Sequence, residues 1–230
     1  MAQQRATAPR TKPAWLIRAT GRGAPTVTYA IIALCVVMFV LQNLPVVGST
    51  VTQSLWYAGV YSFPQMFEPW RMLTSIFLHA NLIHIALNMY TLWIFGIVLE
   101  PMLGRGRFLA LYLISGFAGS LAVLLITPPN QAVLGASGAI FGMFGAFFII
   151  QRRLGAQATQ ILVLVAINLA IGFIPGFNIS WQAHVGGFVG GFLVGLIYVE
   201  TRRLDRRRWQ LPLVILLCVA LVAVSLLHFF

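Results

Sequence analysis

The sequence predicts an all-α, polytopic membrane protein. Of its 230 residues, 60% are hydrophobic and only 8% are charged, whereas a soluble domain has roughly 25% charged residues. Long apolar runs fill most of the chain, and a helix needs about 20 apolar residues to cross a bilayer. The basic residues stand almost entirely between alternate runs. These three observations exclude an ordinary soluble domain.

The apolar runs predict seven spans separated by polar connections. The spans are 27–46, 72–98, 107–126, 135–150, 157–174, 182–198 and 211–230. A polar, basic arm at 1–26 precedes the first span and shows no small-residue cleavage site. We therefore expect the first span to remain as an anchor rather than to be removed as a signal peptide.

The net charge of +11 is distributed unevenly along the chain. Fourteen of the 15 basic residues lie in four segments that share one side of a seven-span protein, and Arg71 alone lies on the other. This is the positive-inside pattern, so we expect a multi-pass protein of the plasma membrane with a cytoplasmic N-terminus and an external C-terminus. The pattern indicates contact with the lipid bilayer and argues against nucleic acid as a partner.

The connection at 47–71 is the longest, and it falls on the outer side. It is rich in tryptophan and tyrosine, which favour the membrane interface, and a connection of this length is usually folded or functional. We expect short amphipathic helices there. The two cysteines, Cys35 and Cys218, lie inside predicted spans without metal-ligand spacing, and no metal or cofactor is expected.

Polar side chains recur at one depth in three of the spans. His84, Ser137 and His184 each precede a charged residue at the cytoplasmic boundary by 15 or 16 residues, which is roughly 22–24 Å of helix. All three therefore fall in the outer half of the bilayer, and Asn88 lies one turn below His84 on the same face. Ionisable groups inside spans are costly and are functional by default.

A serine and a histidine at one depth predict a nucleophile and its general base. A carboxylate partner is not expected, because three of the four acids fall on the cytoplasmic side and Glu68 lies in the outer loop. His84 and Asn88 are then candidate donors to an oxyanion. Structural alternatives remain open, since Ser137 can serve close helix packing, His184 can be a satisfied interior histidine and Asn88 can bond between helices.

Glycines follow the serine and the second histidine at four-residue spacing. Gly138 and Gly142 follow Ser137, and a second series follows His184. Such faces allow helix backbones to approach closely. We expect this face to hold the fourth span against the sixth, with the serine and the histidine at its outer end.

Four motifs resemble those of the rhomboid intramembrane serine proteases. They are GASGAIFG at 135–142, AHVGGFVGG at 183–191, HANLIHIALNM at 79–89 and EPWR at 68–71. The resemblance covers residues 68–191 and implies a six-helix rhomboid core plus one C-terminal transmembrane helix. The implied divisions are a cytoplasmic arm at 1–26, a catalytic core at 27–200, and a basic linker with the seventh helix at 201–230.

The resemblance also assigns roles. Ser137 matches the nucleophile, His184 the base, and His84 and Asn88 the oxyanion donors, while Glu100 matches a structural acid. Phe141 departs from the family pattern, which often has a hydroxyl-bearing aromatic at this position. The motif residues with implied structural roles are Trp70, Arg71, Gly135, Gly138, Phe141, Gly187 and Gly191.

The resemblance implies an intramembrane serine endopeptidase. It would use a Ser–His dyad to cleave transmembrane helices of other membrane proteins near the outer face, without a cofactor. One alternative is a catalytically inactive rhomboid-like protein that binds transmembrane helices, which is expected to lack the serine or the histidine. A transporter is the other, and it predicts midplane polar sites and internal repeats that the sequence does not show.

Overall fold

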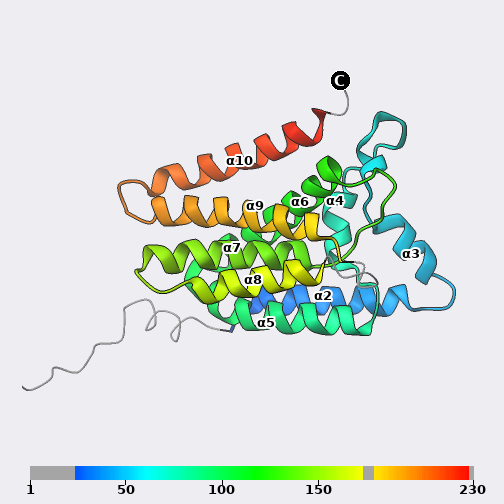
Figure 1. Ribbon diagram of the computed structural model, residues 1–230, viewed down its shortest axis with the longest axis horizontal. Coiled ribbons are helices and arrows are strands. Elements are labelled where there is room, and N and C mark those ends of the chain that lie inside the picture. The colour runs from blue at the N-terminus through cyan, green and yellow to red at the C-terminus, as the bar shows by residue number, and fades with distance from the viewer. Residues whose placement is uncertain (1–23, 173–178, 228–230) are drawn as a thin grey trace, which may run out of the picture.

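The computed structural model describes residues 24–172 and 179–227, so most of the predicted arm at 1–26 lies outside the described residues. In these residues seven helices have 13 residues or more, and they run back and forth along roughly one direction to form a bundle (Figure 1). They are α2 (Thr26–Gln42), α5 (Leu82–Leu103), α6 (Arg105–Ile126), α7 (Ser137–Arg153), α8 (Thr159–Ile171), α9 (Trp181–Glu200) and α10 (Gln210–Ser225). In the described residues, extended pairing is limited to an isolated bridge between Tyr57 and Val133. The prediction of an all-α membrane fold is confirmed.

Length and composition qualify four segments to cross a membrane. Among the described residues these are α5, α6, α9 and Arg207–Ser225, the last of which includes α10. Helices α2 and α8 are apolar but shorter, and α7 has 17 residues that end in two arginines. The chain is thus a multi-pass membrane protein, and within the described residues α2, α7 and α8, with 17, 17 and 13 residues, are shorter than the roughly 20 residues that a crossing needs.

The predicted start of the second span, at residue 72, is wrong. Residues 71–77 instead form the short helices α4 (Arg71–Thr74) and η3 (Ser75–Phe77), and α5 begins only at Leu82. The run is apolar because Met72, Ile76 and Leu78 are buried inside the protein rather than exposed to lipid. Hydropathy alone does not separate these two environments.

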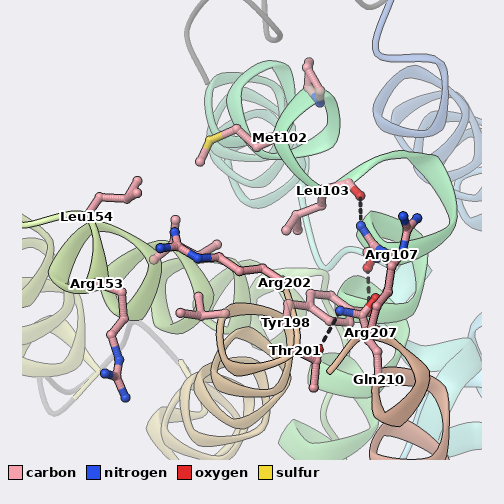
Figure 2. Close-up of a pocket in the computed structure, with 13 residues that line it drawn as sticks. Met102, Leu103, Arg107, Arg153, Leu154, Tyr198, Thr201, Arg202, Arg207 and Gln210 are labelled. Carbon is pink, nitrogen blue, oxygen red and sulfur yellow. Dashed lines mark hydrogen bonds between the residues drawn. The ribbon is translucent and has the colours of Figure 1, made fainter. Parts of the chain in front are cut away.

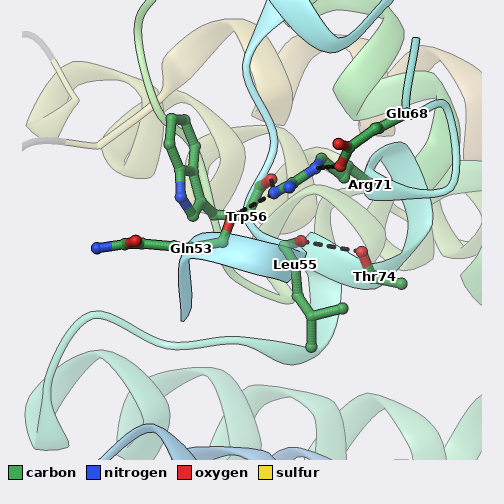
Figure 3. A network of polar contacts seen from close by, with 6 residues as sticks. All are labelled: Gln53, Leu55, Trp56, Glu68, Arg71 and Thr74. Carbon is green, nitrogen blue, oxygen red and sulfur yellow. Dashed lines mark hydrogen bonds and ion pairs between the residues drawn. The ribbon is translucent and has the colours of Figure 1, made fainter. Parts of the chain in front are cut away.

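The long connection folds into short helices at the end of the bundle where α7 and α9 begin (Figure 1). They are α3 (Gly48–Leu55), η1 (Gly59–Ser62), η2 (Pro64–Met66) and then α4. Buried Arg71 fastens them together, as Figure 3 shows. Its guanidinium donates to the Glu68 carboxylate and to the carbonyl oxygens of Gln53 and Trp56, and it lies 3.9 Å from the centre of the Tyr61 ring.

Helices α7 and α9 touch through their backbones. A Cβ placed on Gly187 would lie 1.9 Å from the Gly138 carbonyl oxygen, and one on Gly191 would lie 2.0 Å from that of Gly142. Helix α6 joins them, because a Cβ on Gly142 would also lie 2.0 Å from the Ser115 hydroxyl. Any side chain at these positions would separate the helices, so the glycines fix the distance between α7 and α9.

Glu100, near the end of α5, caps the start of α2. Its buried carboxylate accepts hydrogen bonds from the backbone N–H groups of Val27 and Thr28, at 3.0 and 2.8 Å, and from the Thr28 hydroxyl at 2.7 Å. These are N–H groups that a helix start leaves without an intrahelical partner. The acid therefore has a structural position, at the opposite end of α5 from His84.

Candidate active site

Ser137 is the first residue of α7, and a glycine turn sets its position. Gly135 has φ of +133°, a conformation that side-chain-bearing residues rarely adopt, and its N–H donates to the Ser75 carbonyl at 3.0 Å. A Cβ on Gly135 would lie 2.9 Å from Nε2 of His84 and 3.9 Å from the Ser137 hydroxyl oxygen. The His84 ring and the serine hydroxyl therefore border the same small space.

His184 lies in the first turn of α9, which Ser180 caps by accepting from the Ala183 N–H. Its buried ring stacks on Phe141, with ring centres 4.0 Å apart and 11° between the planes. Phe141 is one turn beyond Ser137 on α7. The Ala183 carbonyl also lies 3.3 Å from where a Cβ of Gly138 would stand. The residues that flank the serine and the histidine are thus in contact.

The imidazole of His184 has no acid beside it. Within residues 24–172 and 179–227, its buried Nδ1 has no hydrogen-bond partner. All four acids of the chain lie in the described part, and each is occupied elsewhere. Their partners are Arg71 for Glu68, Val27 and Thr28 for Glu100, Arg153 for Glu200, and Arg203 for Asp205.

His84 and Asn88 lie one turn apart on α5. The Ala80 N–H donates to Nδ1 of His84 at 3.4 Å, and we infer that the ring proton is therefore on Nε2, the nitrogen that faces Gly135. The Asn88 amide is buried and donates one N–H to the His84 carbonyl at 2.9 Å. A primary amide has two N–H bonds, so one remains for a ligand.

His79, for which the sequence favours an interfacial or loop-bonding role over a catalytic one, is a neighbour of the site. It lies in the loop before α5, and its ring meets the His84 ring edge-on at 5.2 Å between centres. Burial, reinforced by the neighbouring His84, lowers the pKa of His79 to about 3. His79 is therefore neutral near pH 7 and places no positive charge beside His84.

Two residues of the predicted set lie away from the serine. Trp70 caps α4 and is 54% exposed, and Arg71 is committed to the loop network of Figure 3. Arg71 therefore holds the loop together, while the Trp70 side chain is largely exposed. In the part of the chain that the structure describes, no group of three metal-ligating side chains comes together.

Comparison with known proteins places this arrangement in a family. Residues 66–201 match the rhomboid domain. The chain is 42% identical over 177 residues to the rhomboid protease GluP of Bacillus subtilis, covering 74% of this chain and 34% of that protein. It is 35% identical over 186 residues to YdcA, a rhomboid protein of the same organism, covering 77% of this chain and 90% of YdcA.

A plant relative, RHOMBOID-like protein 1 of Arabidopsis thaliana, is 41% identical over 140 residues, which is 57% of this chain and 35% of the plant protein. The chain thus spans about a third of the length of GluP and of this plant protein.

Proposed function

The chain belongs to the rhomboid family, and from that premise we propose that it is an intramembrane serine endopeptidase. Ser137 is the nucleophile and His184 the general base. The substrates are transmembrane segments of other membrane proteins, cut at the end of the bundle where α7 and α9 begin. Relatives that carry the name protease support this reading.

The proposed chemistry needs only groups present at the site. The Ser137 hydroxyl attacks the scissile carbonyl while His184 accepts its proton, and His184 then returns the proton to the leaving amine. Water hydrolyses the acyl-enzyme with the roles reversed. The developing oxyanion is stabilised by the Nε2–H of His84 and by the remaining amide N–H of Asn88. The N-terminus of α7 adds its positive dipole end.

The stacking of His184 on Phe141 carries the proposal. In a triad, a carboxylate orients the imidazole, and here every carboxylate is bound elsewhere. The flat contact with Phe141, one turn from Ser137, supplies an orientation without a charge. Among the described residues the buried Nδ1 of His184 has no hydrogen-bond partner, which favours a base over a histidine with a purely structural role. We therefore assign a dyad.

We further propose that the site lies toward the outside of the plasma membrane. Nine of the ten arginines in the described residues belong to the end of the bundle opposite Ser137, where α5, α7 and α9 end (Figure 1). The positive-inside rule places that end in the cytoplasm. The N-terminus is then cytoplasmic and the C-terminus external.

The proposal is tested with purified protein in detergent, using a fluorophosphonate probe and a model transmembrane substrate. The probe should label the wild type, and Ser137→Ala should abolish both labelling and cleavage without a change in thermal stability. Ser225→Ala, at the end of α10, is the matched control and should leave both intact. If the folded wild type neither reacts nor cleaves, the inactive helix-binding alternative replaces the protease.

A further inference from the structure

A cavity of about 470 Å³ lies at the end of the bundle opposite Ser137. Its walls come from the α5–α6 turn, the last turns of α7 and α9, and the start of α10 (Figure 2). Hydrogen bonds frame it. The Tyr198 hydroxyl donates to the Arg107 carbonyl at 3.2 Å, and the Gln210 amide donates to the Thr201 hydroxyl at 2.7 Å. The cavity is thus a feature of the helix packing.

Four arginines line this cavity, and three of them have no acid. Their positions are 107, 153, 202 and 207. Arg153 pairs with Glu200. The other acids nearby are occupied, Glu100 by the start of α2 and Asp205 by Arg203. Positive charge gathered in a cavity without a counter-charge favours an anionic ligand.

The arginines approach the cavity from different sides. In Figure 2 the Arg202 side chain extends toward the end of α7, whereas Arg107 and Arg207 lie on the other side. The Arg107 guanidinium is steadied by the Leu103 carbonyl at 3.4 Å. Planar guanidinium groups on opposite sides of one cavity suit a phosphate, whose oxygens accept paired N–H bonds on more than one side.

The surroundings favour a lipid over a soluble anion. From His184 to the end of α9 at Glu200 is 16 residues, about 24 Å at 1.5 Å each, so this end lies across most of a hydrocarbon core about 30 Å thick, near the level of the headgroups. Apolar side chains, Met102, Leu103, Leu154 and Val199 among them, complete the wall. Basic pockets between membrane helices bind the headgroups of anionic phospholipids.

We propose that this cavity binds the phosphate of an anionic phospholipid, with Arg107, Arg202 and Arg207 as the recognising cations. The glycerol backbone and the first acyl carbons lie against the apolar wall. A zwitterionic phospholipid carries the same phosphodiester, but its ammonium group is repelled by the arginines. Lipid binding at this cavity does not depend on the activity of Ser137, so its test is independent of the test of the proposed protease.

The test is native mass spectrometry of the full chain, titrated with phosphatidylglycerol and, separately, with phosphatidylcholine. The wild type should bind phosphatidylglycerol preferentially. Arg202→Gln/Arg207→Gln should weaken that binding roughly 30-fold, taking about 1 kcal/mol for each arginine. The control, Arg105→Gln/Arg206→Gln, removes the same charge from the same end at exposed positions outside the cavity and should change binding less than about 3-fold.

Three outcomes overturn the proposal. Equal losses in the two double variants would show general surface attraction rather than a site. Unchanged binding in Arg202→Gln/Arg207→Gln would remove the arginines from recognition. Competition by glycerol phosphate as effective as that by the intact lipid would identify a soluble phosphate as the ligand. A rise in thermal stability on adding phosphatidylglycerol, present in the control and absent in Arg202→Gln/Arg207→Gln, supports the site independently.

Discussion

The two ends of the α7–α9 pair differ in charge: one end has a buried histidine without a carboxylate beside it, and the other has an exposed ion pair. At one end Ser137 and His184 stand in the first turns of α7 and α9, no carboxylate lies beside the histidine, and the Phe141 ring stacks on it. At the other end Arg153 of α7 pairs with Glu200 of α9, with side chains that are 52% and 42% exposed. The glycine contacts between the ends fix the spacing of both.

The difference shows at which end of the helix pair a charged side chain costs little free energy. At the exposed end, water and headgroups screen an ion pair, which contributes little to stability. At the buried end, an unscreened carboxylate would require a strong partner. Stacking on Phe141 needs no counter-ion. The absence of a carboxylate beside Ser137 and His184 is therefore explained by the burial of the site as well as by the reaction proposed for it.

Breaking the link between the ends should have the largest effect. Gly191→Val places a side chain where a Cβ already lies 2.0 Å from the Gly142 carbonyl oxygen, so α7 and α9 must separate. We expect a loss of at least about 3 kcal/mol in the free energy of unfolding, measured by thermal denaturation in detergent, together with loss of activity. Gly106→Val is the control, because nothing lies within 4 Å of its Cβ position. A stable, active Gly191→Val protein would contradict the backbone contact.

The next effect concerns the neutral end alone. Asn88→Ala should lower kcat about 10- to 1000-fold, as loss of one oxyanion donor does, with little change in KM or thermal stability. Asn168→Ala is a close control, because Asn168 on α8 makes the same 2.9 Å bond to the carbonyl four residues earlier. If both variants kept full activity, Asn88 would have only the helix-bonding role.

A third variant asks whether the site is truly without an acid. Glu68→Gln should cost roughly 1–2 kcal/mol of stability, because buried Arg71 loses its ionised partner. Probe labelling of the folded fraction should persist, since Glu68 is engaged with Arg71 and not with His184. Loss of labelling as complete as in Ser137→Ala, in a folded protein, would reveal a hidden triad and remove the contrast between the ends.

The smallest effect is expected at the charged end. Glu200→Gln should change stability by less than about 1 kcal/mol, because the pair with Arg153 is solvent-exposed. High salt should reduce even this difference. A double-mutant cycle with Arg153→Gln measures the coupling directly. A coupling well above this value would show that both ends rely on buried electrostatics.

Local patterns predicted much of this arrangement. Hydropathy located α5, α6, α9 and α10, because the side chains of a helix that faces lipid are apolar along most of its length. Counting residues back from the charged cytoplasmic boundary at about 1.5 Å each then placed Ser137 and His184 near the outer ends of their helices. The start of α5 was missed for a related reason, since Met72 and Leu78 are apolar but buried in protein.

Contacts between distant segments were beyond local patterns. Nothing near Thr28 in the sequence indicates that its N–H donates a hydrogen bond to the carboxylate of Glu100, 72 residues away. The arginine cavity is similar. In the sequence, Arg107 and Arg202 each indicate only which side of the membrane their segment lies on. That both line one cavity depends on how two separate turns pack.

The cap that Glu100 places on α2 has a consequence for biogenesis. As the chain emerges, α2 enters the membrane with the N–H groups of Val27 and Thr28 unpaired, and α5 brings a carboxylate that must leave water. Each segment lacks what the other supplies, and burying uncompensated polar groups is costly. We therefore expect α2 to dock on α5 during synthesis, before the serine-bearing helix has been translated.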